Sequence, residues 1–316
     1  MTVRHIIFPA AAAILMAVVM QSCFTGVEST PRITERDITR RNVVVSAEEK
    51  FLSDIHPQMP SHWMSGKKFY VTDNRISLIF TPGVNGATQN VPDSLAGTLL
   101  NLDNVAYGTG VTGADEVRLT FTDHAGRKLV YLPGISRKSF AADSAFQIPF
   151  TVDMDIVRNV SRRLSGNTYW LLTPRRFHED GHESAGLRYV PVTIMDVVPG
   201  NDVNPLRVRF TEKDAADTLS VFITVGSGRR ATRNFNKLFS FANPRDRYPA
   251  ITDKTWNDIM HSQISTGMTP DECRLALGAP DEYLHIPTTA GMVERWTYGD
   301  GTYLFFEDGV LARFRR

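Results

Sequence analysis

The densest local signals in the chain lie in Gly267-Met268-Thr269-Pro270-Asp271-Glu272-Cys273 and in the continuation to Leu277-Gly278-Ala279-Pro280. Thr269 and Glu272 have the spacing of a capping box, in which each side chain accepts a hydrogen bond from the other residue's backbone N–H. Pro270 suits the first helical position, and Gly278 followed by Pro280 marks the end of the helix. The apolar residues recur three and four positions apart on one face: Cys273, Ala276 and Leu277. The stretch therefore predicts a short amphipathic helix, but it indicates no reaction.

The residues around this helix predict a module of two helices and three strands. A preceding helix is expected over Asp253–Ile264, because its apolar residues recur with helical spacing. Three strands follow, separated by glycine-containing turns, at Val293–Tyr298, Thr302–Phe306 and Val310–Arg315. Two helices on a three-stranded antiparallel sheet form a two-layer α+β fold. We expect Trp296 to be buried beneath the helices, against Ile259 and Leu277.

Upstream, the sequence predicts two β-rich units that resemble each other, at residues 46–140 and 141–230. Each begins with a helix and enters its first strand through a Ser-Gly turn. The matching segments are Met64–Val71 with Leu164–Leu171, Val117–Thr122 with Leu206–Thr211, and Lys128–Tyr131 with Thr218–Ile223. We interpret the match as an internal duplication. About five short strands per unit suit a small barrel or sandwich, and an SH3-like barrel is the nearest analogy. Residues 231–250 are expected to link this pair to a module at 251–316, so the chain is predicted to be multidomain and mostly β.

The N-terminus is typical of a targeting segment. Arg4 and His5 precede the apolar run Ile6–Met20, which is short for a membrane span. The next residues, Met20-Gln21-Ser22-Cys23, resemble the lipobox of bacterial lipoproteins. We therefore expect a signal peptide at 1–22, lipidation of Cys23 and a polar tether at 23–45. An ordinary signal peptide with Cys23 as a bystander is the alternative. Phe24, in place of the aspartate that marks inner-membrane retention, favours the outer membrane, and the lack of an acidic run directly after Cys23 favours a periplasm-facing orientation over surface export.

Residues 251–316 resemble the SmpA/OmlA (BamE-like) family of small outer-membrane lipoproteins. The motifs that carry the resemblance are Gly267-Met268-Thr269, Leu277-Gly278-Ala279-Pro280, Trp296-Thr297-Tyr298, and Leu304-Phe305-Phe306 with Gly309-Val310. Members of this family are non-catalytic scaffold subunits of the machinery that inserts β-barrel proteins into the outer membrane. The resemblance implies a periplasmic module that contacts other envelope proteins.

The composition and the motif content argue against several classes of function. The chain has 35 Lys and Arg against 34 Asp and Glu, and this balance argues against nucleic acid as a partner, because phosphate binding needs a basic face. Two cysteines, Cys23 and Cys273, exclude a disulfide framework as the source of stability. We find no motif of an enzyme, a metal site or a cofactor site. The function expected is therefore that of a non-catalytic binding or scaffold protein, attached to the membrane by its lipid.

Two other functions stay open. Paired carboxylates distant in sequence would permit an envelope hydrolase. Aromatic residues on the strands of the two units would permit a glycan- or lipid-binding lipoprotein, and they are Trp63, Tyr70, Tyr169 and Trp170. Two further patterns are interpreted as loops. They are the glycine series Gly108–Gly113, which precedes a strand where a dinucleotide site needs a helix, and the cluster His178–Glu183, which lacks metal-ligand spacing.

Overall fold

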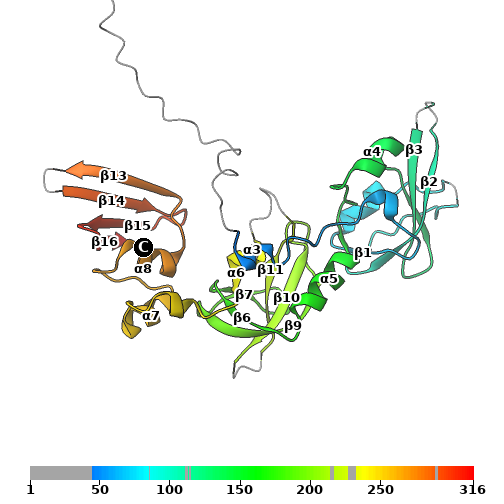
Figure 1. The fold of residues 1–316 in the computed structure, drawn as a ribbon. Helices are drawn as coiled ribbons and strands as arrows, with labels where there is room; N and C mark the ends of the chain where they lie inside the picture. The colour runs from blue at the N-terminus through cyan, green and yellow to red at the C-terminus, as the bar shows by residue number, and fades with distance from the viewer. Residues whose placement is uncertain are drawn as a thin grey trace, which may run out of the picture. The chain divides into compact units, whose positions relative to one another are not determined.

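The computed structural model describes residues 45–84, 86–110, 113, 115–213, 217–226, 233–288 and 291–316. In this part the protein is mostly β, with short helices between the strands of three sheets (Figure 1). The predicted signal peptide, Cys23 and the tether up to residue 44 lie outside the described residues. Within the described residues, no helix combines the length and hydrophobicity that a membrane span requires.

The first sheet is open and entirely antiparallel, with the strand order β4-β3-β2-β1-β5. Its strands are β1 (Lys68–Val71), β2 (Leu99–Thr109), β3 (Asp115–Thr122), β4 (Lys128–Tyr131) and β5 (Thr151–Asp153). Buried residues alternate along β3, as expected of a strand with one face on a core. That core includes Phe69, Leu100, Phe121 and, from helix α4 (Arg137–Ala142), Phe140.

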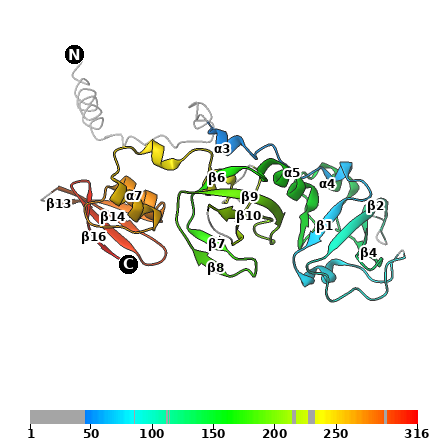
Figure 2. The same cartoon turned by 90° about the horizontal axis from the view of Figure 1, so that it is seen from below.

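The second sheet has the strand order β12-β6-β9-β10-β11-β7-β8, and Figure 2 shows β6, β9 and β10 side by side. Its strands are β6 (Thr168–Leu171), β7 (Arg175–Phe177), β8 (Glu183–Ala185), β9 (Val190–Pro199), β10 (Leu206–Glu212), β11 (Leu219–Ile223) and β12 (Phe239–Ser240). Helix α5 (Met154–Leu164) precedes it and buries Ile156, Val157, Val160 and Leu164. Helix α6 (Phe235–Leu238) leads into β12.

The two sheets share one order and one register. Omitting the β7–β8 hairpin, β11-β10-β9-β6-β12 matches β4-β3-β2-β1-β5 strand for strand. Strands β2 and β9 each carry a bulge at the matching place, because Asp103 in β2 and Met195 in β9 fall outside the pairing register. Phe121 and Phe210 lie beside these bulges, paired with Leu102 and Ile194. The predicted overlay of Phe121 on Phe210 therefore agrees with the pairing of the strands.

The predicted small β-barrels are wrong for the described residues, because both central sheets are open. In each sheet the last strand of the matching set returns to the first, β5 to β1 and β12 to β6. These returning strands are only three and two residues long. Within the described strands, each of these short strands pairs with one neighbour only, so the hydrogen bonding between strands does not continue to the opposite edge and close a barrel.

The predicted unit boundaries also differ from the sheets. A boundary at 140/141 separates β5 from the first sheet, which it completes, and the expected linker 231–250 contains β12 of the second sheet. The leading helix assigned to the first unit is α3 (Ala47–Lys50), a single turn. The residues just after it, Phe51, Leu52 and Ile55, pack in the core of the second sheet. Contacts between residues far apart in sequence decide which sheet or core each of these segments joins. The order of the segments along the chain does not reveal those contacts.

The third sheet has four strands where three were expected, in the order β13-β14-β15-β16. They are β13 (Glu282–Thr288), β14 (Gly291–Thr297), β15 (Tyr303–Glu307) and β16 (Val310–Arg315). Pro287 in β13 disfavours a central strand, but an edge strand tolerates proline because one side of its backbone is unpaired. A bulge at Ala312 places Val310 and Phe314 on opposite faces, since Val310 pairs with Glu307 and Phe314 with Leu304.

One face of the third sheet packs against helix α8 (Pro270–Leu277), and α8 also contacts helix α7 (Asp253–Met260). The capping box of Thr269 and Glu272 is complete, which confirms that prediction. Trp296 is fully buried in a cluster with Met268, Cys273, Leu304, Phe306 and Leu311, and Leu277 packs against it as expected. The expected contact with Ile259 is wrong. Ile259 belongs to another cluster, with Trp256, Ala276 and Tyr189 of the second sheet's β6–β9 connection.

Candidate functional site

The face of the third sheet that points away from Trp296 forms the first candidate site, and we call it the outer face. The pairing register places on it the apolar and aromatic side chains Leu284, Ile286, Val293, Tyr303, Phe305 and Val310, together with Arg295, Arg313, Arg315, Thr297, Glu282 and Glu307. Leu284 is 46% exposed and Val310 is 40% exposed. Apolar side chains that gather on one exposed face are typical of a surface that contacts another molecule. Among the described residues, the buried cluster around Trp296, to which α8 contributes, lies on the opposite face of the sheet.

Arginines run among the apolar side chains of the outer face. The Arg313 guanidinium lies over the Phe305 ring, 4.8 Å from its centroid. The Arg295 Nε atom is buried and has no hydrogen-bond partner among the described residues. A buried donor without a partner costs free energy until another group accepts its hydrogen bond. The outer face therefore combines apolar area with hydrogen-bond donors that can take acceptors from a partner.

The edge strand β13 adjoins the outer face. It pairs with β14 over seven residues, and within the described strands its other side is not paired. Tyr283, Leu284 and Ile286 are all exposed on this strand. An exposed edge strand offers backbone N–H and C=O groups to an extended segment of another chain. The sequence analysis missed β13, although the apolar residues of Glu282–Ile286 are the signal that could have found it.

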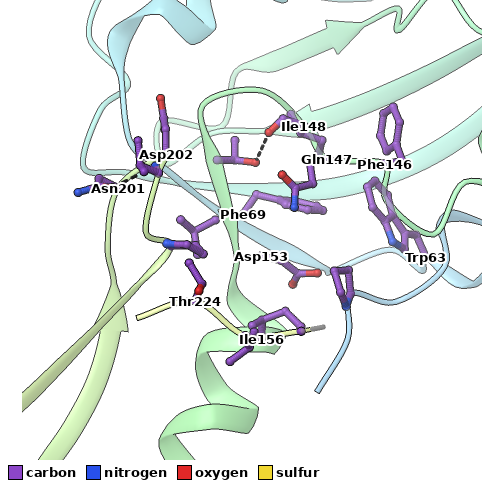
Figure 3. Close-up of a pocket in the computed structure, with 17 residues that line it drawn as sticks. Trp63, Phe69, Phe146, Gln147, Ile148, Asp153, Ile156, Asn201, Asp202 and Thr224 are labelled. Carbon is purple, nitrogen blue, oxygen red and sulfur yellow. Dashed lines mark hydrogen bonds between the residues drawn. The ribbon is translucent and has the colours of Figure 1, made fainter. Parts of the chain in front are cut away.

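A cavity of about 390 Å³ is the second candidate site, and it lies between elements of the first and second sheets. In Figure 3, Trp63 and Phe146 stand together at one end, and Asn201 and Asp202 stand at the other. Asp153 lies between these ends. The residues come from β1 and the segment before it, from β5 and the segment before it, from the start of α5, and from the β9–β10 and post-β11 turns.

The cavity's carboxylates are held in ion pairs. The Lys67 Nζ atom lies 2.8 Å from Asp153 Oδ2 and 2.7 Å from Asp155 Oδ2, and the Lys67 side chain is only 3% exposed. Asp153 also caps α5 by accepting from the Asp155 N–H. Asp202 accepts from the Thr72 hydroxyl, and its Oδ2 atom lies 3.6 Å from an Arg75 guanidinium nitrogen. These contacts connect the first sheet to the β9–β10 turn and to α5.

The aromatic residues proposed from the sequence as ligand platforms do not come together. Among the four, only Trp63 lines the cavity, and Tyr169 is a core residue that packs on Phe235 and Phe239. Tyr70 also packs against the core of the second sheet. Core strands place aromatic residues inward, and sequence spacing does not separate this use from ligand binding. Phe146, which the sequence analysis overlooked, completes the aromatic end of the cavity.

The His178–Glu183 cluster is spread over hairpin contacts. Asp180 pairs with His182 at 3.0 Å, Glu179 with Arg209 at 3.1 Å, and Glu183 with Arg175 at 2.6 Å. No three His, Cys, Asp or Glu side chains of the described residues gather as a metal site. Of the glycine series, Gly108 and Thr109 lie in β2 and Val111 and Thr112 lie outside the described residues.

Cys273 is a buried thiol. Burial raises its pKa to about 12, and the neighbouring Glu272 carboxylate raises it in the same direction. A thiol with so high a pKa holds little thiolate at neutral pH, and the thiolate is the nucleophilic form. Cys273 is thus a packing residue beneath Trp296. Comparisons of the chain with protein-family models, with curated proteins and with solved structures find no match in any of the three.

Proposed function

We propose that this protein is a non-catalytic lipoprotein of the outer membrane that binds another envelope protein and serves as a scaffold. In this proposal Cys23 carries the lipid, the tether 23–45 separates lipid from folded protein, and the folded part faces the periplasm. The partner contacts the outer face of the third sheet and the β13 edge. The resemblance of 251–316 to the SmpA/OmlA (BamE-like) family supports the same assignment, and so does the absence of an enzyme motif in the sequence.

The observation that carries the proposal is the apolar, arginine-containing outer face. Leu284, Ile286 and Val310 expose apolar surface next to the unpaired side of β13, while Arg295 and Arg313 supply donors. A segment with alternating apolar and acidic residues would match this pattern, because its carboxylates would accept from the arginines. Main-chain hydrogen bonds to β13 would add affinity without requiring a pocket.

The finer fold is part of the proposal. The first and second sheets are diverged copies of one SH3-like unit, opened into a sheet, and the shared order and matching bulges support this origin. Helices α7 and α8 with the third sheet form a two-layer α+β module of the BamE-like kind. The completed capping box and the buried Trp296 support that comparison.

A photo-crosslinking amino acid at position 284 tests the partner contact. Leu78 provides the matched control, since it is 82% exposed and lies in the 3-10 helix η2 (Asn74–Ile79), away from the third sheet. We expect one envelope protein to crosslink at position 284 in intact cells and not at position 78. We also expect Ile286→Asp to abolish that crosslink. Equal crosslinking at both positions would show that the outer face has no specific partner.

Membrane attachment is tested separately. Cys23→Ala should release the protein into the soluble periplasm or leave it unprocessed, because the proposed lipid bonds to this thiol. Fractionation of cell envelopes measures this outcome. Mature Cys23→Ala protein that stays tightly bound to the membrane would contradict the lipid anchor.

A further inference from the structure

We propose that the cavity between the first and second sheets binds an uncharged saccharide. This site is distinct from the outer face, so it does not depend on the proposed protein partner. Its lining combines aromatic, amide and carboxylate side chains, among them Trp63, Phe146, Gln147, Asp153, Asn201 and Asp202. A volume of about 390 Å³ falls within the range of small-molecule sites, roughly 300–1,000 Å³.

The charges of the lining argue against an anionic ligand. Among the described residues that line the cavity there is no lysine, arginine or histidine, whereas Asp153 and Asp202 are present. A phosphate or carboxylate ligand would therefore meet two carboxylates, with no cation among the described lining residues and with Lys67 and Arg75 already paired to carboxylates. Anionic saccharides and nucleotides are unsuitable on this ground.

The same carboxylates do not call for a cationic ligand, because cations of the protein already face them. Lys67 is buried against Asp153, and Arg75 approaches Asp202 while also pairing with Asp73. Ion pairs inside a protein interact strongly, so a ligand cation would gain little at a carboxylate that is already paired. The remaining lone pairs can still accept hydrogen bonds from hydroxyl groups. Uncharged hydroxyl donors therefore suit the cavity best.

The aromatic end provides a surface for the apolar C–H face of a sugar ring. Phe146 is half-buried, and its ring centroid lies 5.0 Å from that of Phe140 and 5.8 Å from that of Trp63. These contacts fix the ring in place, so little side-chain entropy is lost on binding. The Trp63 Nε1–H donates to the Gln58 carbonyl, which holds the indole in turn. The aromatic pair is thus a preorganised platform.

The cavity also offers side-chain amide groups that can form hydrogen bonds with a ligand. The exposed Gln147 side chain has no hydrogen-bond partner in the part of the chain that the structure describes. Asn201 Oδ1 accepts from the Val203 and Asn204 N–H groups, which orients its Nδ2 group as a donor. Hydroxyl groups donate and accept, so they can pair with both amides. Aromatic surface beside amides and carboxylates matches a sugar, which has apolar faces and a hydroxyl rim.

Titration calorimetry on the full chain, kept in a detergent without a sugar headgroup, tests the proposal. The probes are three neutral trisaccharides, namely triacetylchitotriose, maltotriose and cellotriose, with de-N-acetylated chitotriose as the cationic probe and trigalacturonate as the anionic one. We expect at least one neutral trisaccharide to bind at millimolar concentration and trigalacturonate not to bind. Failure of all three neutral probes, or tighter binding of either charged probe, would overturn the assignment. Cleavage of a bound trisaccharide would also overturn it, in favour of a hydrolase.

Two variants locate the site. Phe146→Ala should weaken binding about tenfold or more, as expected for loss of an aromatic anchor. Gln147→Ala should weaken it roughly threefold to tenfold, the effect of one lost hydrogen bond. Gln147 is exposed, so this variant is expected to fold even if Phe146→Ala does not. Gln263→Ala is the matched control, an exposed glutamine after α7. Unchanged binding in Gln147→Ala and Phe146→Ala would place the saccharide elsewhere and contradict the proposal.

Discussion

The first and second sheets share their strand order and bulge positions, but they differ at the edge beside β4 and β11. In the first sheet, the segment between β1 and β2 forms η2 and contacts β4 through the bridge of Phe80 to Tyr131 and through the Thr81 and Thr88 N–H groups, which donate to the Val130 and Lys128 carbonyls. In the second sheet, the corresponding segment forms the β7–β8 hairpin, which pairs with β11. The matching strands of the two sheets thus share their pairing registers, whereas the segment that contacts β4 in one sheet and β11 in the other differs. An edge strand contributes less to the core than a central one, so its neighbour can change at small cost.

The hairpin of the second sheet depends on a buried arginine. Arg176 is 1% exposed, and its Nε atom lies 2.6 Å from Glu212 Oε1. Its Nη2 group donates to the Leu187 carbonyl. Burial lowers the pKa of Arg176, and the Glu212 carboxylate acts in the opposite direction. In the first sheet, apolar Phe80 stands beside β4 at the corresponding edge. The same position is therefore filled by an apolar ring in the first sheet and by an ion pair in the second.

The largest effects should come from the shared core. Phe121→Ala and Phe210→Ala each remove a fully buried ring at matching places, and each should lower the free energy of unfolding by about 3–5 kcal/mol. Chemical denaturation of both variants measures the two costs. If one cost is below about 1 kcal/mol while the other is large, the two positions are not equivalent and the comparison fails.

A smaller but still severe effect should follow from Gly186→Ala. A Cβ atom at this position would lie 1.3 Å from Arg176 Nη1, so the guanidinium would have to leave its buried site. Breaking a buried ion pair costs about 3–5 kcal/mol, and partial relaxation should reduce this to roughly 2–3 kcal/mol. Denaturation midpoints measure the loss.

Gly108→Ala is the control for that variant. Gly108 lies in β2, whereas Gly186 directly follows β8, and a Cβ atom at Gly108 would meet no other atom within 4 Å. Its cost should be near zero. Equal stability of the Gly186→Ala and Gly108→Ala variants would show that Arg176 is not packed against Gly186.

Asp123, in the β3–β4 turn of the first sheet, should make a pH-dependent contribution of intermediate size to the free energy of unfolding. Burial raises the pKa of Asp123, but backbone and side-chain hydrogen bonds from Arg127 and the Ala125 N–H outweigh burial and leave that pKa below its usual range. A carboxylate with a lowered pKa contributes stability above its unfolded pKa of about 3.9, and the contribution is lost as pH falls through the folded pKa.

Asp123→Asn should therefore cost about 1–3 kcal/mol at pH 7, and the difference from the parent protein should shrink below about pH 4. Urea denaturation at several pH values measures this dependence. A cost that stays constant from pH 7 down to pH 3 would show that the charge of Asp123 contributes nothing, and that only shape matters at this turn.

The smallest effects test the entry turns that the two sheets share. Gly66 and Gly166 have φ angles of 90° and 79°, which favour glycine, and their N–H groups donate to Leu102 and Ile194 over 2.8 Å in both cases. Gly66→Ala and Gly166→Ala should each cost about 1–2 kcal/mol, the penalty of a left-handed conformation for an L-residue. Thermal unfolding should give similar losses for both, and a loss confined to one would separate the two turns.

The sequence by itself determined the features that depend on near neighbours. The Thr269–Glu272 capping box was predicted, because its hydrogen bonds join residues three positions apart, and the glycine turns before β1 and β6 were predicted, because a positive φ angle is a local property that favours glycine. The alternation along β3 and β10 likewise reports which side chains face a core. The matching of the two units was visible for the same reason.

Only the tertiary structure decided which distant segments meet. The return of β5 and β12 to their sheets, the packing of Ile259 on Tyr189, and the addition of β13 depend on pairing and burial between residues far apart. The cavity depends on such contacts too, since its walls come from segments well over one hundred residues apart. Periodicity specifies that a face is buried, but the partner is chosen by complementary shape and by the free energy of burying both surfaces together.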